Sequence, residues 1–402
     1  LEDITTNGGC TAVGYQALLD NTQSNNTGIG YQALRLNTTG ANNVAVGLQA
    51  GNANTTGNQN TFIGYQSADA NTTGDNNTTL GAFALGANTT GSNNVAIGAY
   101  TLDAATTGSN NTGVGYGALG AATSASGNTA CGQGALSART TGFENVAVGL
   151  DALRDGTTGY QNIAVGGSAL KVYTGNGNVA VGNQSLEDCT TGAHAVAVGH
   201  DALRNVTTGG SNTAVGSVSG VTLTTNDNCT FVGHASGSAT SGSNNTFVGT
   251  QCGYNVTTGA SCVAVGYQAG GYSQSSEGNN NTSVGKMAGR NLSSGGQNTL
   301  IGEAAAVDLS TGSNNVCIGQ DAGRGGASGN ITTGSNNVVL GNANTANLYC
   351  TDTSISSSDS RDKTDVNNFT AGLSWINKLR PVTYRWDRRH WYASRIEGAA
   401  DE

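Results

Sequence analysis

A short pattern of apolar and polar positions repeats along most of this chain. It is seen at Asn43 to Gly47 (Asn-Val-Ala-Val-Gly) and returns with variations at Asn94 to Gly98 and Asn315 to Gly319. The closing glycine stands at residues 14, 30, 47, 64, 81, 98, 115, 132, 149, 166, 182, 199, 216, 233, 249, 266, 285, 302, 319 and 341. The interval is 17 residues at most steps, 16 at three steps, and longer only near the end. Twenty copies of so short a unit predict a repeat protein.

Positions counted from the closing glycine show how each unit is built. Position −3 is always Val, Ile or Thr, position −1 is Val, Ile or Leu in all copies but one, and position −2 is mostly small. This alternation predicts a short strand with two different faces. We expect the β-branched and aliphatic residues, such as Val44 and Val46, to face inward. The side that carries Asn43 and Ala45 is then free to pack against neighbouring chains.

The rest of the unit predicts a second strand and a turn. Gln32-Ala33-Leu34 represents a segment that alternates like a strand, and Thr38-Thr39-Gly40 represents the turn that follows it. Position −4 is asparagine in sixteen copies. Either its stacked amides bond to one another along the axis, or asparagine is there because it tolerates turn dihedrals, and both explanations can hold together. The prediction is an all-β fold, a parallel β-roll or β-helix of about 20 rungs over residues 1–345.

Composition supports a regular β fold and excludes several other classes. The chain has 63 glycines, one proline and only 10% charged residues. Its glycines lack the period of collagen, and every unit keeps the apolar pair that disordered segments lack. The net charge is −9, so neither nucleic acid nor an anionic membrane is an expected partner. No stretch is apolar enough to predict membrane insertion. Since Leu1 falls within a degenerate repeat, we expect the chain to be a piece of a longer protein.

The rung is small, which bears on the oligomeric state. A rung of two short strands encloses little core, and its small-residue face lacks a partner. Three identical rods around a threefold axis would supply both, so we expect a homotrimer, with a monomeric solenoid as the alternative.

The Val-Ala-Val-Gly units over residues 8–345 resemble the head repeats of trimeric autotransporter adhesins. The resemblance implies a trimeric, left-handed parallel β-roll. The units of this chain are longer than those of that family, so its turns are expected to differ.

The composition changes near residue 345. Residues 351–402 hold all three tryptophans and the only proline. Apolar residues between Asp365 and Leu379 have helical spacing, Pro381 ends that helix, and Val382 to Trp386 reads as a strand. We therefore predict a separate, small α+β segment over residues 346–402.

Two stretches of this segment resemble the endosialidase-type intramolecular chaperone of phage tailspikes and tail fibres. They are Ser358 to Val366 and Leu379 to Trp386, and the likeness is expected to stop there, because His390 to Glu402 departs from the family pattern. The resemblance implies a domain that trimerises, aligns three β-rich chains and then cuts itself off between Ser357 and Ser358. Carried over residue by residue, Ser358 is the nucleophile, Lys363 its base, and Asp359 a residue that orients the pair.

Other chemistry is weakly indicated. The eight cysteines have no metal-type spacing, so we expect small buried substitutes, with cross-links between chains as the alternative. The four histidines predict no metal site, and no motif predicts a cofactor. Asn-Thr-Thr at Asn37 and three later positions matches a glycosylation acceptor, although the turn explains it better. An ice-binding threonine array ranks lower still.

These patterns together favour a structural and binding protein. We expect a phage tail fibre on the virion surface, exposed to the outside, with other virion proteins and a host-surface glycan or protein receptor as partners. Binding is expected at the two long intervals, through Tyr272, Gln274, Glu277, Arg324 and Asn330, because inserted loops on a rigid scaffold commonly carry recognition. The alternatives are a bacterial trimeric surface adhesin and a glycan-degrading tailspike that uses a pair of carboxylates.

Overall fold

The computed structural model describes residues 8–272, 276–325 and 330–347. By its internal contacts the chain divides into a unit of residues 1–345 and a second unit of residues 346–402. The described part is all-β and contains only short strands, turns and bends. The predicted helix at 365–379 and strand at 382–386 lie outside the described residues.

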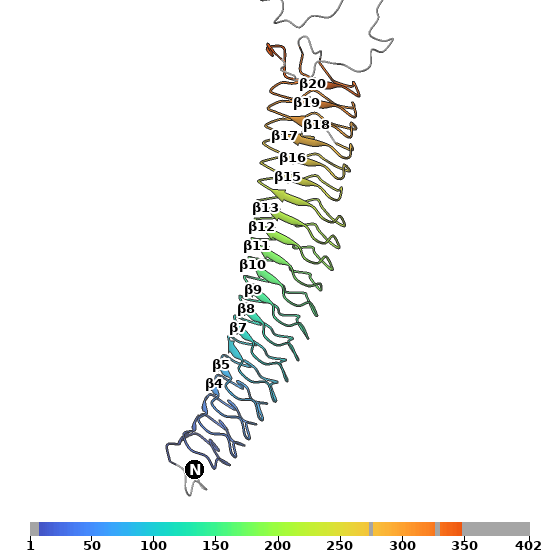
Figure 1. Ribbon diagram of the computed structural model, residues 1–402. Coiled ribbons are helices and arrows are strands. Elements are labelled where there is room, and N and C mark those ends of the chain that lie inside the picture. The colour runs from blue at the N-terminus through green and yellow to red at the C-terminus, as the bar shows by residue number, and fades with distance from the viewer. Residues whose placement is uncertain (1–7, 273–275, 326–329, 348–402) are drawn as a thin grey trace, which may run out of the picture. The chain divides into compact units, whose positions relative to one another are not determined.

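Twenty strands of three residues each run along the first unit (Figure 1). Their bounds are β1 Thr11–Val13, β2 Thr27–Ile29, β3 Val44–Val46, β4 Thr61–Ile63, β5 Thr78–Leu80, β6 Val95–Ile97, β7 Thr112–Val114, β8 Thr129–Cys131, β9 Val146–Val148, β10 Ile163–Val165, β11 Val179–Val181, β12 Val196–Val198, β13 Thr213–Val215, β14 Thr230–Val232, β15 Thr246–Val248, β16 Val263–Val265, β17 Thr282–Val284, β18 Thr299–Ile301, β19 Val316–Ile318 and β20 Val338–Leu340.

Each strand pairs in parallel with the strands of the preceding and following repeats, always in the same register. Val44, Ala45 and Val46 of β3 lie beside Thr61, Phe62 and Ile63 of β4, for example. One repeat is therefore one rung of a parallel β-solenoid, as predicted. The closing glycine is required by this stacking, because a Cβ on Gly47 would lie 2.3 Å from the carbonyl oxygen of Gly64 in the next rung.

The prediction of the strand faces is wrong. The middle residue of each strand, at position −2, points inward, and Ala45, Phe62 and Ala96 are fully buried. The flanking β-branched and aliphatic residues are half-buried or exposed in the single chain. Alternation alone shows that two faces differ but not which is the interior, and the rung is narrow enough that alanine fits inside.

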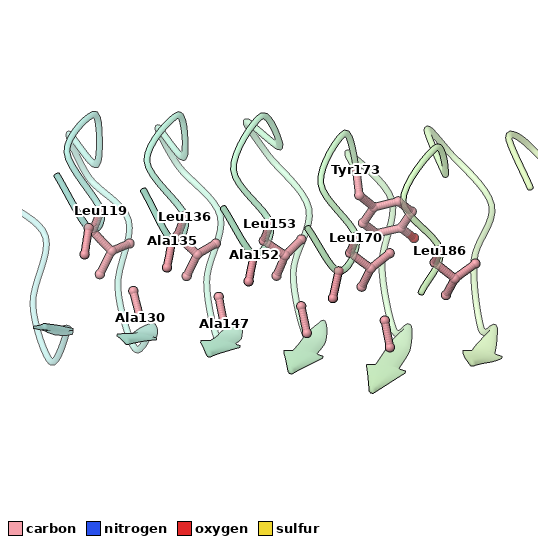
Figure 2. Packing of buried hydrophobic residues seen from close by; sticks show 14 of the residues in the cluster. Leu119, Ala130, Ala135, Leu136, Ala147, Ala152, Leu153, Leu170, Tyr173 and Leu186 are labelled. Carbon is pink, nitrogen blue, oxygen red and sulfur yellow. The ribbon is translucent and has the colours of Figure 1, made fainter. Parts of the chain in front are cut away.

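The interior is filled by two columns that face each other across the rung. Alanine at −2 of the strand meets leucine at position +4 of the opposite turn, and Figure 2 shows Ala130 and Ala147 directed toward the column of Leu119, Leu136 and Leu153. Where the strand carries phenylalanine, the turn carries glycine. A Cβ on Gly51 would come within 2.5 Å of the Phe62 ring, and one on Gly253 within 2.4 Å of the Phe247 ring. One chain thus encloses two apolar clusters, one from Leu18 to Ala269 and one from Ala288 to Val339.

The predicted second strand is also not present. Positions +2 and +4 adopt positive φ, with values of 56° at Gln32 and 51° at Leu34. Alternate amides therefore donate in opposite directions, from Gln32 to the Tyr15 carbonyl of the rung before and from Leu34 to the Ala50 carbonyl of the rung after. Non-glycine residues rarely adopt this conformation. The period of two that suggested a strand comes from alternation of the backbone dihedrals.

Asparagine ladders run inside the solenoid at two positions. At −4, the Asn60 backbone N–H donates to Asn43 Oδ1 at 2.9 Å, and Asn60 Nδ2 donates to the Gly74 carbonyl at 2.8 Å. In the Asn-Thr-Thr turns, Asn54 Nδ2 donates to Asn37 Oδ1 at 2.7 Å. Positive φ belongs to position −5 instead, as at Asn42. Amides at −4 also bond directly, as where Asn94 Nδ2 donates to Asn77 Oδ1 at 3.2 Å, so the ladder explanation holds for this position. The side chain of Asn37 is fully buried, which favours the turn over a glycosylation acceptor.

Candidate functional site

An exposed apolar stripe follows the strands along the solenoid. We call the residues at −3 and −1 of β1 to β20 the sheet stripe; its −1 column is Val, Ile or Leu except at Cys131, and its −3 column is Thr on eleven strands and Val or Ile on nine. In this stripe Val13 is 57% exposed, Leu80 50% and Ile318 41%. Further exposed members are Ile29, Ile97, Val148, Ile163, Val215, Val232, Val263, Val265, Ile301, Val338 and Leu340.

The area of this stripe is comparable to that of the largest apolar patches on monomeric proteins, which are often functional. Complete burial of one aliphatic side chain removes roughly 60–120 Å² of apolar area from water. With exposed fractions near 40%, the exposed members together present on the order of 500 Å², which is as large as the patches that mark interaction sites. Exposed members alternate with half-buried ones along the strands, and the −1 residue recurs once per rung, so the stripe fits a partner with the same spacing.

A column of aromatic residues extends the stripe over the first rungs. These residues lie one or two positions after the closing glycine and stack along the axis. The Tyr15 and Tyr31 rings are 5.4 Å apart, and Tyr65, Phe83, Tyr100 and Tyr116 follow at 5.1–5.8 Å. The same column is polar or charged farther along, as at Lys286 and Glu303, which form an ion pair of 3.1 Å.

The first predicted binding loop places Tyr272 in a cluster of planar side chains. Its ring lies 5.6 Å from the Tyr254 ring, and the Arg290 guanidinium lies 5.1 Å from the Tyr272 centroid. Asn255 Nδ2 donates to the Tyr272 carbonyl at 2.6 Å. These contacts fix Tyr272 within the stack of rungs. Gln274, predicted in the same loop, lies outside the described residues.

The second predicted loop is a separate place in the fold. Arg324 is exposed and pairs with Asp321 at 3.1 Å and Asp308 at 3.9 Å, and it lines a hollow with Asn342 to Asn344. Asn330 is exposed. Glu277 instead lines another hollow, so the structure does not bring the predicted loop residues into one site.

That other hollow is polar and has a volume of about 300 Å³. We call it the amide hollow, and it is lined by Glu277, Gly278, Asn279, Asn280, Ser294, Gly296, Gln297 and Ser313. Most of these residues were missed by sequence reasoning, which considered only the long intervals. A usable signal was Gly296 at position −6, where most other rungs carry a side chain such as Asn58, Asp75 or Ser92 and glycine recurs only at Gly8 and Gly210, together with Ser294 in the turn before it.

Burial, partial or complete, shifts the pKa of several titratable groups. Burial raises the pKa of the Asp69 and Asp103 carboxyls, which lie on either side of Gly86. The Arg139 side chain is fully buried, and burial lowers its pKa to about 10. Only its Nη1 donates to a protein atom, the Gly159 carbonyl at 2.6 Å, whereas Nε and Nη2 have no protein partner.

Cysteine environments fall into two kinds in the described part. Cys189, Cys229, Cys252, Cys262 and Cys317 are buried free thiols, and burial raises the pKa of Cys189 and Cys252 to about 12. They fit the expectation of small buried substitutes, and Cys10 is half-buried. Cys131 does not, because it is exposed at position −1 within the sheet stripe.

In the described ranges no group of three or more His, Cys, Asp or Glu is placed to hold a metal ion. The part of the chain that the structure describes also contains no helix that is long and apolar enough to cross a bilayer. Ser358, Asp359 and Lys363, predicted for self-cleavage, lie outside it.

Comparison with known proteins bears on the segment that contains Ser358, Asp359 and Lys363. Residues 358–400 match the chaperone of endosialidase family. The match covers the Ser358 motif, and it extends past Trp386, so the expectation that the likeness stops there is wrong. No curated protein and no solved structure gives a significant match to the chain. The chain therefore has a parallel β-solenoid followed in sequence by a segment similar to the chaperone of endosialidase, and in this order of parts it is similar to tail fibres and tailspikes.

Proposed function

We propose that this chain is the shaft of a homotrimeric fibre on a virion, of the phage tail fibre kind, and that the fibre attaches to the host cell surface. The chaperone of endosialidase segment then serves to assemble three chains and to release itself by one cleavage.

The observation that carries the proposal is the sheet stripe. Its apolar side chains repeat once per rung over twenty strands, so only a partner with the same spacing covers them all. A second and a third copy of this chain have that spacing, because their rungs are identical to those of the first. The copies would meet through the Val, Ile and Leu column at −1 and the mixed Thr, Val and Ile column at −3, instead of the Ala and Asn side predicted at first.

The matched segment supports the number three and the order of events. Residues 358–400 match the chaperone of endosialidase family, and that resemblance implies a segment that trimerises and aligns β-rich chains. Alignment matters for this fold, because identical rungs can pair in many shifted registers. A terminal domain that fixes the ends of three chains would remove the shifted alternatives before the solenoids meet.

Two experiments test the parts of this proposal. Denaturing mass spectrometry of the full chain should find a product that ends at Ser357, and Ser358→Ala should abolish it. Uncut wild-type chain would contradict self-cleavage. For attachment, fluorescently labelled full chain is added to a panel of Gram-negative and Gram-positive cells. Saturable binding to some of them is expected, and its absence from all would count against a role in attachment.

A further inference from the structure

The amide hollow has the chemistry of a ligand site. We propose that it binds a neutral, polyhydroxylated saccharide, which rests on the proposed attachment function and names the chemical class it recognises. The hollow spans the turns of three consecutive rungs, those that lead into β17, β18 and β19.

The hollow exists because two side chains are missing or short. Gly296 leaves position −6 empty between Asn279 and Ser313, and Ser294 stands where most turns have a second threonine. In other rungs position −6 bonds along the stack, as where the Asp75 backbone N–H donates to Ser92 Oγ at 3.0 Å. The Gly296 N–H still donates to Ser313 Oγ at 3.1 Å, but residue 296 has no side chain to accept from the Asn279 N–H, and the space of that side chain is open.

The groups around this space retain free hydrogen-bonding capacity. No side-chain hydrogen bond is found for Glu277, Asn280 or Gln297 within the described residues, whereas Asn279 Oδ1 accepts the Ala260 N–H at 2.8 Å. Each primary amide offers two donors and an acceptor, and the carboxylate accepts only. Such a set matches neighbouring hydroxyl groups, each of which both donates and accepts.

Other ligand classes fit less well. The lining contains no aromatic or aliphatic side chain to anchor a peptide and no Lys or Arg to hold a phosphate. The Glu277 carboxylate would repel an acidic sugar. A volume of about 300 Å³ accommodates one or two sugar rings but not a folded partner.

The repeats offer two variants of the hollow, each with a matched control in another rung. Gly296→Asn fills the hollow with a residue that the same column carries at Asn58. Its Cβ would lie 2.9 Å from the Asn279 carbonyl oxygen, so that carbonyl has to shift by a few tenths of an ångström to admit it. Gly210→Asn makes the same change at the same position of a rung outside the hollow. Gln297→Gly removes an amide at a position of positive φ where other rungs carry Gly127 and Gly177, and Gln59→Gly is its control.

Saturation-transfer NMR on the full chain, with N-acetylglucosamine, galactose, rhamnose, chitobiose and lactose as probes, tests the proposal. At least one probe should bind with a millimolar dissociation constant. Gly296→Asn should abolish its signal, Gln297→Gly should weaken binding about fivefold, and both controls should bind as wild type does.

Three results would overturn the proposal. They are no transfer to any probe, equal binding by Gly296→Asn, and equal loss in Gly210→Asn. If the protein adheres to cells while no probe binds, attachment stands and the amide hollow is not its site. If a probe binds as expected while no cell is bound, the saccharide site stands and the attachment function fails.

Discussion

Leu80→Lys tests the sheet stripe most sharply. Leu80 is 50% exposed at the last position of β5, so its replacement disturbs the core of a single chain little. Complete burial of a leucine is worth about 1.5–3 kcal/mol. Burial of the exposed half then contributes roughly 0.8–1.5 kcal/mol per chain, and about 2–4 kcal/mol for three chains at one level. Three lysines that meet at this level add charge repulsion to that loss.

The expected change is roughly a 30- to 1,000-fold weaker trimer, because each 1.4 kcal/mol is a factor of ten. A shaft with twenty rungs will not dissociate at one substitution, so the assay is sedimentation velocity across a urea series. The urea midpoint for loss of trimer mass should fall for Leu80→Lys. Thr90→Lys adds the same charge to an exposed turn and should leave the midpoint near wild type. Equal midpoints for the two variants would show that the sheet stripe is not an interface.

Three further predictions follow from the interior and from the thiols. Phe62→Ala should lower the unfolding free energy by about 3–5 kcal/mol and Gly51→Leu by about 1–3 kcal/mol. The double variant should recover most of both losses, because it restores the alanine–leucine pair of other rungs. Additive losses in denaturant unfolding would refute this pairing. Asp69→Asn should raise the thermal midpoint at pH 7, because burial raises the pKa of this carboxyl above 3.8 and the folded state disfavours its ionised form. The gain should vanish as the pH falls below about 4, where the Asp69 carboxyl is protonated in the unfolded chain as well. The new amide of Asn at position 69 would also lie one rung from Asn52 Oδ1, which has no hydrogen-bond partner. A gain in thermal midpoint that does not depend on pH would contradict burial of the carboxylate as its cause. Cys131 should react with a maleimide when the protein is monomeric and be protected in the trimer, and an unprotected Cys131 in the trimer would place the interface elsewhere.

The sequence predicted the architecture well and the interior poorly. Recurrence of the closing glycine predicts the stacking, and the strands fall at positions −3 to −1 in every rung. The error about the two faces has a physical origin. Val44 and Val46 are larger and more apolar than Ala45, but a narrow solenoid admits the smaller side chain and leaves the larger pair for a partner. A residue that is buried between chains and a residue that is buried within one chain are both apolar, so the sequence pattern does not distinguish them.

The turn and the candidate site show a second limit. Leucine at positive φ, as at Leu34, is rare enough that no propensity suggests it. It becomes acceptable because each such turn is hydrogen-bonded to the rungs on either side. The amide hollow depends on the missing side chain at Gly296. Because the chain has 63 glycines, this one is recognised as unusual only when the repeats are aligned and position −6 is compared between rungs.

The native mass of the full chain tests the central claim most directly. The account predicts a single species of three times the 40.0 kDa chain, less any cleaved terminal segments, in native mass spectrometry at neutral pH. A stable monomer at micromolar concentration, with the sheet stripe open to solvent, would contradict it.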